Sequence, residues 1–324
     1  MTDTTDSELT NTRESADHPA PVDEPSAAEL EVESLERQLS EKSESFGRQA
    51  TRAFVTNRLA IIGAVVLLII ILLAIFGPMM RPYSFEERNV LERNQGPSMD
   101  HWFGTDNIGR DLFVRTTRGA RTSLVISGVT AIIAVSVGVL LGALAGYFGK
   151  FVDGSISFVT NLFLTIPLYA ILLVFGKKFG ADPLALSFVI ALFIWTRAAR
   201  IVRSQFLALS QQEFVQAARA AGARGGRIIF RHILPHSVGP IAVEFTLTAG
   251  LAIILESTLS FLELGVVAPE TSLGALVAEA KGQFTSQPSA VLLPGMFIVA
   301  IILSLNFMGD GLRDAFDPQA NSRN

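Results

Sequence analysis

Long runs of apolar residues, separated by polar segments, fill most of this 324-residue chain. A helix needs about 20 apolar residues to cross the hydrocarbon of a bilayer. The segments that approach this length are Leu59 to Gly77 and residues 122–148, 156–175, 184–200, 238–262 and 290–308. The pattern predicts an all-α membrane protein with six transmembrane helices, which places both termini on one side of the membrane.

The composition supports this class and argues against several kinds of chemistry. Apolar residues make up 49% of the chain and charged residues 17%, with a mean hydropathy of +0.42, which is too apolar for an ordinary soluble domain. The chain has no cysteine, so neither disulfides nor thiolate metal ligands are expected. The phosphate-binding pattern G-x-x-x-x-G-K-[ST] is missing as well, so we expect no ATP hydrolysis, no catalytic residue and no cofactor on this chain.

The N-terminal segment differs from the rest in charge and in hydrophobicity. Residues 1–58 contain thirteen Asp and Glu against six Lys and Arg, a net charge of −7, and the whole chain is −4, so the remainder carries +3. With too little apolar surface to offset its chain entropy, the segment 1–50 is predicted to be an acidic, largely disordered cytoplasmic tail. Leucines at residues 30–39 suggest a short surface helix within it. The other predicted domains are a transmembrane domain at 51–318 and a C-terminal tail at 319–324.

Arginines in the polar segments indicate orientation, because Lys and Arg are retained preferentially on the cytoplasmic side. The segment between the fourth and fifth spans has one acidic residue and these arginines: Arg197, Arg200, Arg203, Arg219, Arg224, Arg227 and Arg231. It is predicted to be cytoplasmic, and six spans then make both termini cytoplasmic. Residues 78–121 and 263–288 would be external, although the first of these segments is also rich in arginine. We base the orientation on the nearly acid-free segment.

The stretch QAARAAGARGGRIIFRHILP, residues 216–235, has the properties of a docking element. Its alanines favour helix and keep the side chains small, and Gly222 can adopt the positive φ that ends a helix. A second short helix is predicted from about Arg227 to Leu234, with its end at Pro235. Small residues let another surface approach closely, and arginines supply charged hydrogen bonds around it. In a generic membrane protein, arginines that serve only topology and lipid-phosphate contact are the simpler interpretation.

The stretch also resembles the cytoplasmic loop of ABC-importer permeases, written E-A-A, three residues, Gly, nine residues, then I-x-L-P. Gln216 replaces the acid of that pattern, and His232 replaces its first apolar residue. The His-Ile-Leu-Pro ending is typical of the peptide and nickel branch of these permeases.

Two further stretches resemble the same branch. HWFGTDNIGRDLFVRTTRGARTSL, residues 101–124, is similar to its segment after the first span, and ILESTLSFLELGVVAPETSLGAL, residues 254–276, is similar to its segment closing the fifth. Glu263 stands where the family often has glycine, and Val267–Ala268 lie in a turn that usually contains proline. Together the similarities cover about residues 50–318.

The resemblance implies a six-span permease of the ABC importer type with a cytoplasmic coupling helix. Such a chain is the non-catalytic, multi-pass subunit of a cell-membrane complex that imports peptides through a pore shared with a second homologous permease. The other implied partners are two cytoplasmic ATP-binding subunits, which bind the ATP and Mg, an external substrate-binding protein and membrane lipid. In the family the loop at 213–235 couples to the ATPases, which assigns that role here to Gln216, Ala217, Ala218, Arg219, Gly222, Arg224 and Arg227.

Two other functions remain open. Nickel or another metal chelate is a possible substrate, because the same signatures serve both transport classes. A membrane scaffold or sensor with a lipid-binding basic loop is the alternative from a different class, and it predicts a salt-sensitive interaction without partner ATPases. Nucleic acid is not an expected partner, since the rest of the chain is committed to the membrane.

Carboxylates inside a span are costly unless they face water, a partner or a hydrogen-bond network. Glu256, with Ser260 nearby, is therefore a candidate for the interface with the second permease or for the translocation path. Glu244 lies near the predicted cytoplasmic end of the same span and could reach interfacial water or Arg231. His232 and His236 have no evident third ligand, so no metal site is predicted there.

The external segment offers a further candidate surface. Asp111 and Arg115 are four residues apart, within reach of an ion pair in a helix, and Arg118 continues that face. The surface is either an interfacial helix held by charges or a cap under the binding protein that guides substrate to the pore. Small residues at 138, 142 and 146 predict close helix packing, and Pro167 and Pro294 predict kinks.

Overall fold

The computed structural model describes residues 51, 54–180 and 182–316, so the two predicted tails lie outside the described residues. The described part forms helices and loops, with an isolated β-bridge between Thr105 and Asp111. The helices long and apolar enough to span a membrane are α3 (Arg58–Phe76, extended by η1, Gly77–Met79), α4 (Leu112–Phe148), α7 (Pro183–Ser210), α11 (Val238–Phe261) and α13 (Pro288–Phe316). The all-α membrane fold is confirmed.

A further candidate span is broken in the middle. Helices α5 (Lys150–Thr165) and α6 (Leu168–Phe179) are bent by 79° relative to each other, whereas the sequence predicted one span over 156–175 with a kink at Pro167. Pro167 lacks a backbone N–H and disfavours helix at the preceding residue, and Ile166 is extended, with φ −76° and ψ 126°. Each half is too short to cross a bilayer alone, so a count of six spans depends on this bent pair.

The second span is longer than predicted. Helix α4 begins at Leu112 and not near residue 122, because Asp111 caps it by accepting a hydrogen bond from the backbone N–H of Val114. Its 37 residues correspond to about 55 Å of helix, against about 30 Å of hydrocarbon. The extra turns at its start carry Arg115, Arg118 and Arg121.

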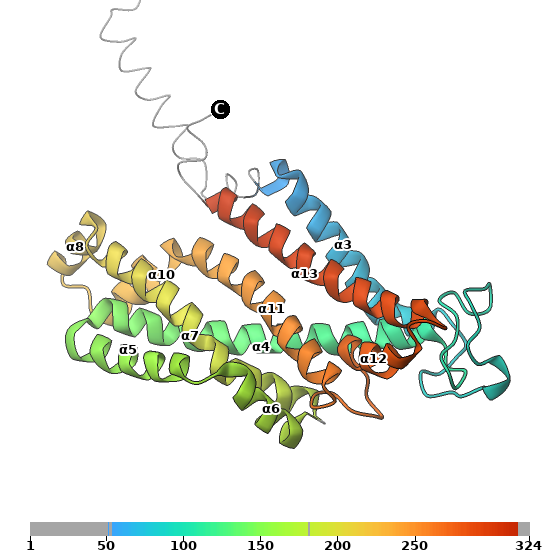
Figure 1. Cartoon of the computed structure of the whole chain (residues 1–324). Helices are drawn as coiled ribbons and strands as arrows, with labels where there is room; N and C mark the ends of the chain where they lie inside the picture. Colours follow the sequence, from blue (N-terminus) through green and yellow to red (C-terminus); the bar gives the residue numbers. More distant parts are fainter. Residues whose placement is uncertain (1–50, 52–53, 181, 317–324) are drawn as a thin grey trace, which may run out of the picture. The chain divides into compact units, whose positions relative to one another are not determined.

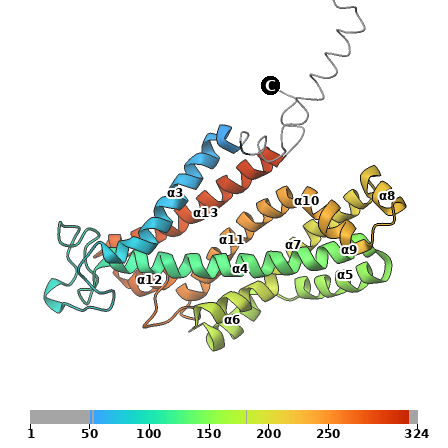
Figure 2. The same cartoon turned by 180° about the vertical axis from the view of Figure 1, so that it is seen from behind.

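Helices α4 and α7 form the most extensive pairing in the described structure (Figure 1). The glycines at 138, 142 and 146 make it possible: a Cβ at Gly142 would lie 2.5 Å from the carbonyl oxygen of Ala199. This confirms the predicted close packing of that ridge. Helices α3 and α13 lie side by side in both views, and α11 packs on α13 and α4 (Figures 1 and 2).

Shorter elements gather at two opposite ends of the long helices (Figure 1). We call residues 213–236 the connector: α8 (Glu213–Ala220), α9 (Gly225–Arg227), the π-helix η3 (Ile228–Ile233) and α10 (Leu234–His236). It shares a core with the C-terminal parts of α4 and α7 through Val202, Phe206, Val215 and Ile229. The loop before α4, which includes η2 (Val90–Glu92), lies with α12 (Leu273–Ala280), η4 (Lys281–Gln283) and the start of α13.

Candidate functional sites at the two ends

The connector presents a short helix with one buried anchor. Val215 is fully buried, whereas Gln216, Ala217 and Arg219 are exposed and Ala218 is half-buried. Val215 and the half-buried Ala218 seat α8 on the core that it shares with α4 and α7, and Ala217 and Ala220 stay open to another surface. The first half of the predicted element is therefore present as a helix with an accessible face.

A left-handed residue ends α8 as predicted. Gly222 has φ +79°, and its N–H donates to the carbonyl oxygen of Arg219 at 2.9 Å, while the Ala223 N–H donates to that of Ala218 at 3.0 Å. These bonds satisfy carbonyls at the end of the helix. A Cβ at Gly222 would meet no atom within 4 Å, so glycine is favoured here by the backbone angle and not by crowding within the chain.

The second connector helix differs from its prediction. It begins at Gly225 and continues past Pro235 to His236, so Pro235 does not end it. The turn directly before the proline is π-helical, where wider i→i+5 spacing accommodates a residue that lacks an N–H and crowds the preceding turn. Arg224 and Arg227 are exposed.

Aromatic contacts in the connector were not anticipated from the sequence. The Arg219 guanidinium lies over the Tyr147 ring, 5.3 Å from its centroid, which fixes this arginine to the end of α4. Phe214 stacks on His236 at 4.8 Å, and the His236 Nδ1 is 2.7 Å from the carbonyl oxygen of His232.

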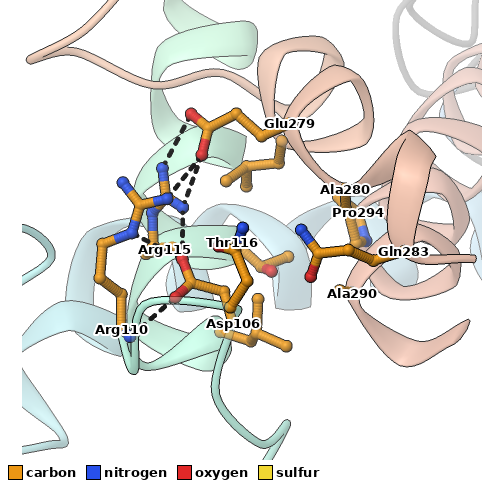
Figure 3. A pocket seen from close by; sticks show the side chains of 12 residues that line it. Asp106, Arg110, Arg115, Thr116, Glu279, Ala280, Gln283, Ala290 and Pro294 are labelled. Carbon is orange, nitrogen blue, oxygen red and sulfur yellow. Dashed lines mark hydrogen bonds and ion pairs between the residues drawn. The ribbon is translucent and has the colours of Figure 1, made fainter. Parts of the chain in front are cut away.

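The opposite end is held by an ion-pair cluster, which we define as Asp106, Arg110, Arg115 and Glu279 (Figure 3). Buried Arg115 donates to Asp106 at 3.0 Å and to Glu279 at 2.9 and 3.1 Å. Arg110 donates to Asp106 at 2.6 Å and to Glu279 at 2.7 Å. The cluster joins the loop before α4, the first turn of α4, and α12.

The charges of this cluster compensate each other. Burial raises the pKa of the Glu279 carboxyl, but hydrogen bonds and attraction from Arg115 and Arg110 outweigh burial and hold that pKa below its ordinary value. The cavity beside the cluster has a volume of about 20 Å³, room for about one water molecule. A larger cavity of about 480 Å³ also borders the cluster, and Arg110, Arg115 and Glu279 line it together with Phe85 and Glu270. The cluster therefore connects chain segments and forms part of the wall of this cavity.

The predicted ion pair between Asp111 and Arg115 is wrong. As the residue that caps α4, Asp111 uses one oxygen for the Val114 N–H at 2.9 Å and places the other 2.8 Å from the His101 Nδ1. Arg118 instead pairs with Glu270 at 3.1 Å and lies over the Phe85 ring at 5.2 Å. Glu279 lies 164 residues after Arg115, so no local pattern in the sequence could indicate that the two residues pair.

Glu256 is fully buried at the junction of three helices. Its oxygens accept hydrogen bonds from Ser123 of α4 at 2.9 Å, from Ser260 at 2.8 Å and from Ser257 at 3.3 Å. Ser123 in turn accepts from the backbone N–H of Leu273 at the start of α12. These hydrogen bonds join α4, α11 and the start of α12 around the carboxylate. A role of Glu256 and Ser260 at the interface with a second permease, or along the translocation path, stays a prediction.

Glu244 has a partner other than the one considered from the sequence. It lies 3.3 Å from Nε of Arg197 on α7 and accepts a hydrogen bond from Thr248 at 3.2 Å. The glutamate is 2% exposed and the arginine side chain 53% exposed. Arg231 is not its partner.

Comparison with known proteins identifies the family. Residues 138–322 match the model of the binding-protein-dependent transport system inner membrane component, and residues 45–97 match that of the N-terminal transmembrane domain of oligopeptide transport permease C. The dipeptide transport system permease protein DppC of Alkalihalophilus pseudofirmus is 40% identical over 85% of this chain and 90% of its own. The oligopeptide transport system permease protein OppC of Bacillus subtilis is 39% identical over 87% and 92%.

A solved structure of the inward-facing MetNI methionine ABC transporter has the same fold. Its similarity is a TM-score of 0.50 at 18% identity, covering 63% of this chain and 96% of the other. The likeness supports the helical architecture alone. The sequence matches decide the family: the chain is a multi-pass permease subunit that belongs to the inner membrane components of binding-protein-dependent transport systems, in the group of oligopeptide transport permease C.

Proposed function

We propose that the chain imports peptides through a pore that it shares with a second, homologous permease. An external binding protein delivers the peptide, and two cytoplasmic ATPases, which bind ATP and Mg, drive the cycle. The relatives named for dipeptide and oligopeptide transport support peptide as the substrate class. In this arrangement the connector and both termini are cytoplasmic, and the ion-pair cluster is external.

The single observation that carries the coupling role is the geometry of α8. One fully buried side chain, Val215, anchors the helix to the core of α4 and α7, and its exposed face carries the small Ala217 and Ala220 beside the polar Gln216 and Arg219. A partner that holds this face can move the long helices through the shared core. Gln216, Ala217, Ala218, Arg219, Gly222, Arg224 and Arg227 are the residues we assign to ATPase coupling.

The test uses the complete complex in liposomes, with ATP hydrolysis and uptake measured together. Ala217→Asp adds volume and a negative charge to the exposed face of α8, and Gly222→Val strains the left-handed turn. The double variant is expected to assemble but to lose stimulation of ATP hydrolysis by loaded binding protein. Gly128→Val is the matched control, since a Cβ there meets no atom within 4 Å and it lies in α4, away from the connector. Normal stimulation in the double variant would leave the connector as a topology anchor.

Metal-chelate import remains a second candidate, because the family signatures in the sequence serve both substrate classes. Purified binding protein from the same transport system separates them: mass spectrometry of its bound ligand should identify a peptide. A bound nickel chelate would replace the peptide proposal. Purification of the chain without any ATPase, combined with salt-sensitive binding to anionic vesicles, would support a scaffold or sensor instead.

A further inference from the structure

A groove lined by polar residues runs between α5 and α7. It lies in the part of these helices that is nearer the connector. Its volume is about 380 Å³, within the range of small-ligand sites. Polar and charged residues line it, namely Ser157, Thr160, Asn161, Arg200 and Arg203. Gly142, Ala145 and Ala199 form small-residue parts of its wall, so no bulky side chain fills the space.

The arginines of this region differ in how their charge is compensated. Arg203 forms an ion pair with Asp153, with an Nη2–Oδ2 distance of 2.6 Å, and Arg197 lies 3.3 Å from a carboxylate oxygen of Glu244. Arg200 is exposed, and its Nη2 donates to the amide oxygen of Asn161 at 2.9 Å. Because that partner is neutral, the groove keeps one positive charge that no carboxylate of the described residues pairs with.

The depth of these residues indicates what they face. Arg200 lies 17 residues after the start of α7 at Pro183, about 26 Å of helix, so it lies near the predicted end of the fourth span, close to the limit of the roughly 30 Å of hydrocarbon. At such a position the guanidinium extends out of the hydrocarbon to water, to a lipid phosphate or to a protein partner, and the groove supplies polar surroundings of this kind. A second cavity of about 400 Å³, lined in part by Pro167 and Arg197, lies beside the break between α5 and α6.

We infer that Arg200 and Asn161 form a carboxylate-binding station on the translocation path, which takes the free carboxylate of the transported peptide. A guanidinium has five N–H donors in a planar fork that matches a carboxylate, and Asn161 occupies one of them. The Asn161 amide nitrogen supplies further donors beside it. This inference rests on the proposed peptide-import function and adds the group of the peptide that the path recognises.

The test compares one tripeptide with a free C-terminal carboxylate and the same tripeptide as its C-terminal amide. Uptake is measured with the complete complex in phosphatidylcholine liposomes, with enough binding protein loaded to saturate the transporter. Arg200→Gln is expected to lower carboxylate-peptide uptake at least about tenfold, the scale of one hydrogen bond to a charged group, and to leave amide-peptide uptake within about twofold. Arg200→Lys, which retains the positive charge, should keep part of the higher uptake of the carboxylate peptide over the amide peptide.

Two further variants separate recognition from folding. Asn161→Asp keeps the size of the side chain but neutralises Arg200 internally, so it should reduce the same uptake ratio. Arg313→Gln, which removes an exposed arginine in the last turn of α13, should leave the ratio unchanged. Assembly of every variant is checked by size-exclusion chromatography and basal ATP hydrolysis.

Three results would overturn the inference. Equal loss of uptake for the two peptides in Arg200→Gln, or no loss, would show that the groove does not recognise the carboxylate. An effect that appears only in liposomes containing anionic lipid would assign the groove to a lipid phosphate. Failure of the unaltered complex to import either peptide would instead reject the proposed function, and the inference with it.

Discussion

Arginines have different surroundings in the ion-pair cluster and in the connector, which lie at opposite ends of the long helices. In the ion-pair cluster, Arg110 and Arg115 share Asp106 and Glu279 at hydrogen-bond distances. In the connector, Arg224 and Arg227 are exposed beside small residues. The first arrangement joins segments of one chain, and the second leaves charged donors accessible to another molecule.

This difference indicates that pairing, and not the number of arginines, separates a surface used within the chain from one left open to another molecule. Both ends appear equally basic when only Lys and Arg are counted, which is why the orientation predicted from the sequence contained a conflict. At the end formed by the loop before α4 and by α12, Arg110, Arg115 and Arg118 contact carboxylates of distant segments. The arginines there have a local structural explanation that does not require a cytoplasmic location.

The largest expected effect on stability is that of Arg115→Ala. The change leaves Asp106 and the partly exposed Glu279 without their buried partner, and we expect a loss of about 2 to 3 kcal/mol, below the full cost of breaking a fully buried pair. The melting temperature of the complex in detergent measures it. Arg115→Lys should lose less, and Arg93→Ala, at an exposed loop position, should lose little. A melting temperature unchanged in Arg115→Ala would mean that the cluster does not stabilise this end.

The same cluster predicts a dependence on pH. The Glu279 pKa is lower in the folded chain, so its stabilising effect is complete above the ordinary glutamate pKa of about 4.3 and is lost as the pH falls through the folded value. Glu279→Gln should therefore melt below the unaltered complex by a constant amount from pH 7 to about pH 5, and the difference should shrink only as the pH falls below about 4.3. The effect should be smaller than that of Arg115→Ala, since 43% of the Glu279 side chain is exposed. A difference that already shrinks between pH 7 and pH 5, or that stays constant at every pH below 4, would contradict the assignment.

Apolar length and local signals sufficed to predict most of the fold. The long spans, the small-residue ridge on α4 and the left-handed Gly222 all depend on interactions between near neighbours or on one helix face, and a single sequence contains those. The break at Pro167 was foreseen only as a kink, because the bend of 79° also requires packing around it. The start of α4 was missed although Asp111 is a strong N-cap residue.

The sites were harder to predict because their partners are distant in sequence. Glu279 and Ser123 come to Arg115 and Glu256 from other helices, and Glu270 comes to Arg118 from the loop before α12. No spacing rule connects these pairs. Family resemblance directed attention to the connector but not to the charges between α5 and α7. Whether a carboxylate pairs with a given arginine can be decided only from the three-dimensional structure, which shows the neighbours of that arginine.

At the connector, Gly222→Ala is expected to destabilise the complex less than Arg115→Ala does at the ion-pair cluster. The left-handed angle costs about 1 kcal/mol or more for a residue with a Cβ, whereas the absence of atoms within 4 Å rules out a clash within the chain. Gly222→Asn should lose less, because asparagine tolerates this conformation. Melting of the complex and stimulation of ATP hydrolysis should both rank glycine, asparagine, alanine. Equal values for all three would show that the turn does not need its left-handed residue.

The smallest expected effect is that of Arg219→Ala, which distinguishes the one connector arginine with a contact inside the chain. Its guanidinium lies over Tyr147, a contact worth about 0.5 to 1 kcal/mol at an exposed site. Tyr147→Leu should cause a similar loss and Tyr147→Phe almost none, whereas Arg224→Ala, at an exposed position, should stay within about 0.5 kcal/mol. If Arg224→Ala destabilised the isolated chain as much as Arg219→Ala, the connector arginines would have structural partners after all, and the contrast between the two ends would disappear.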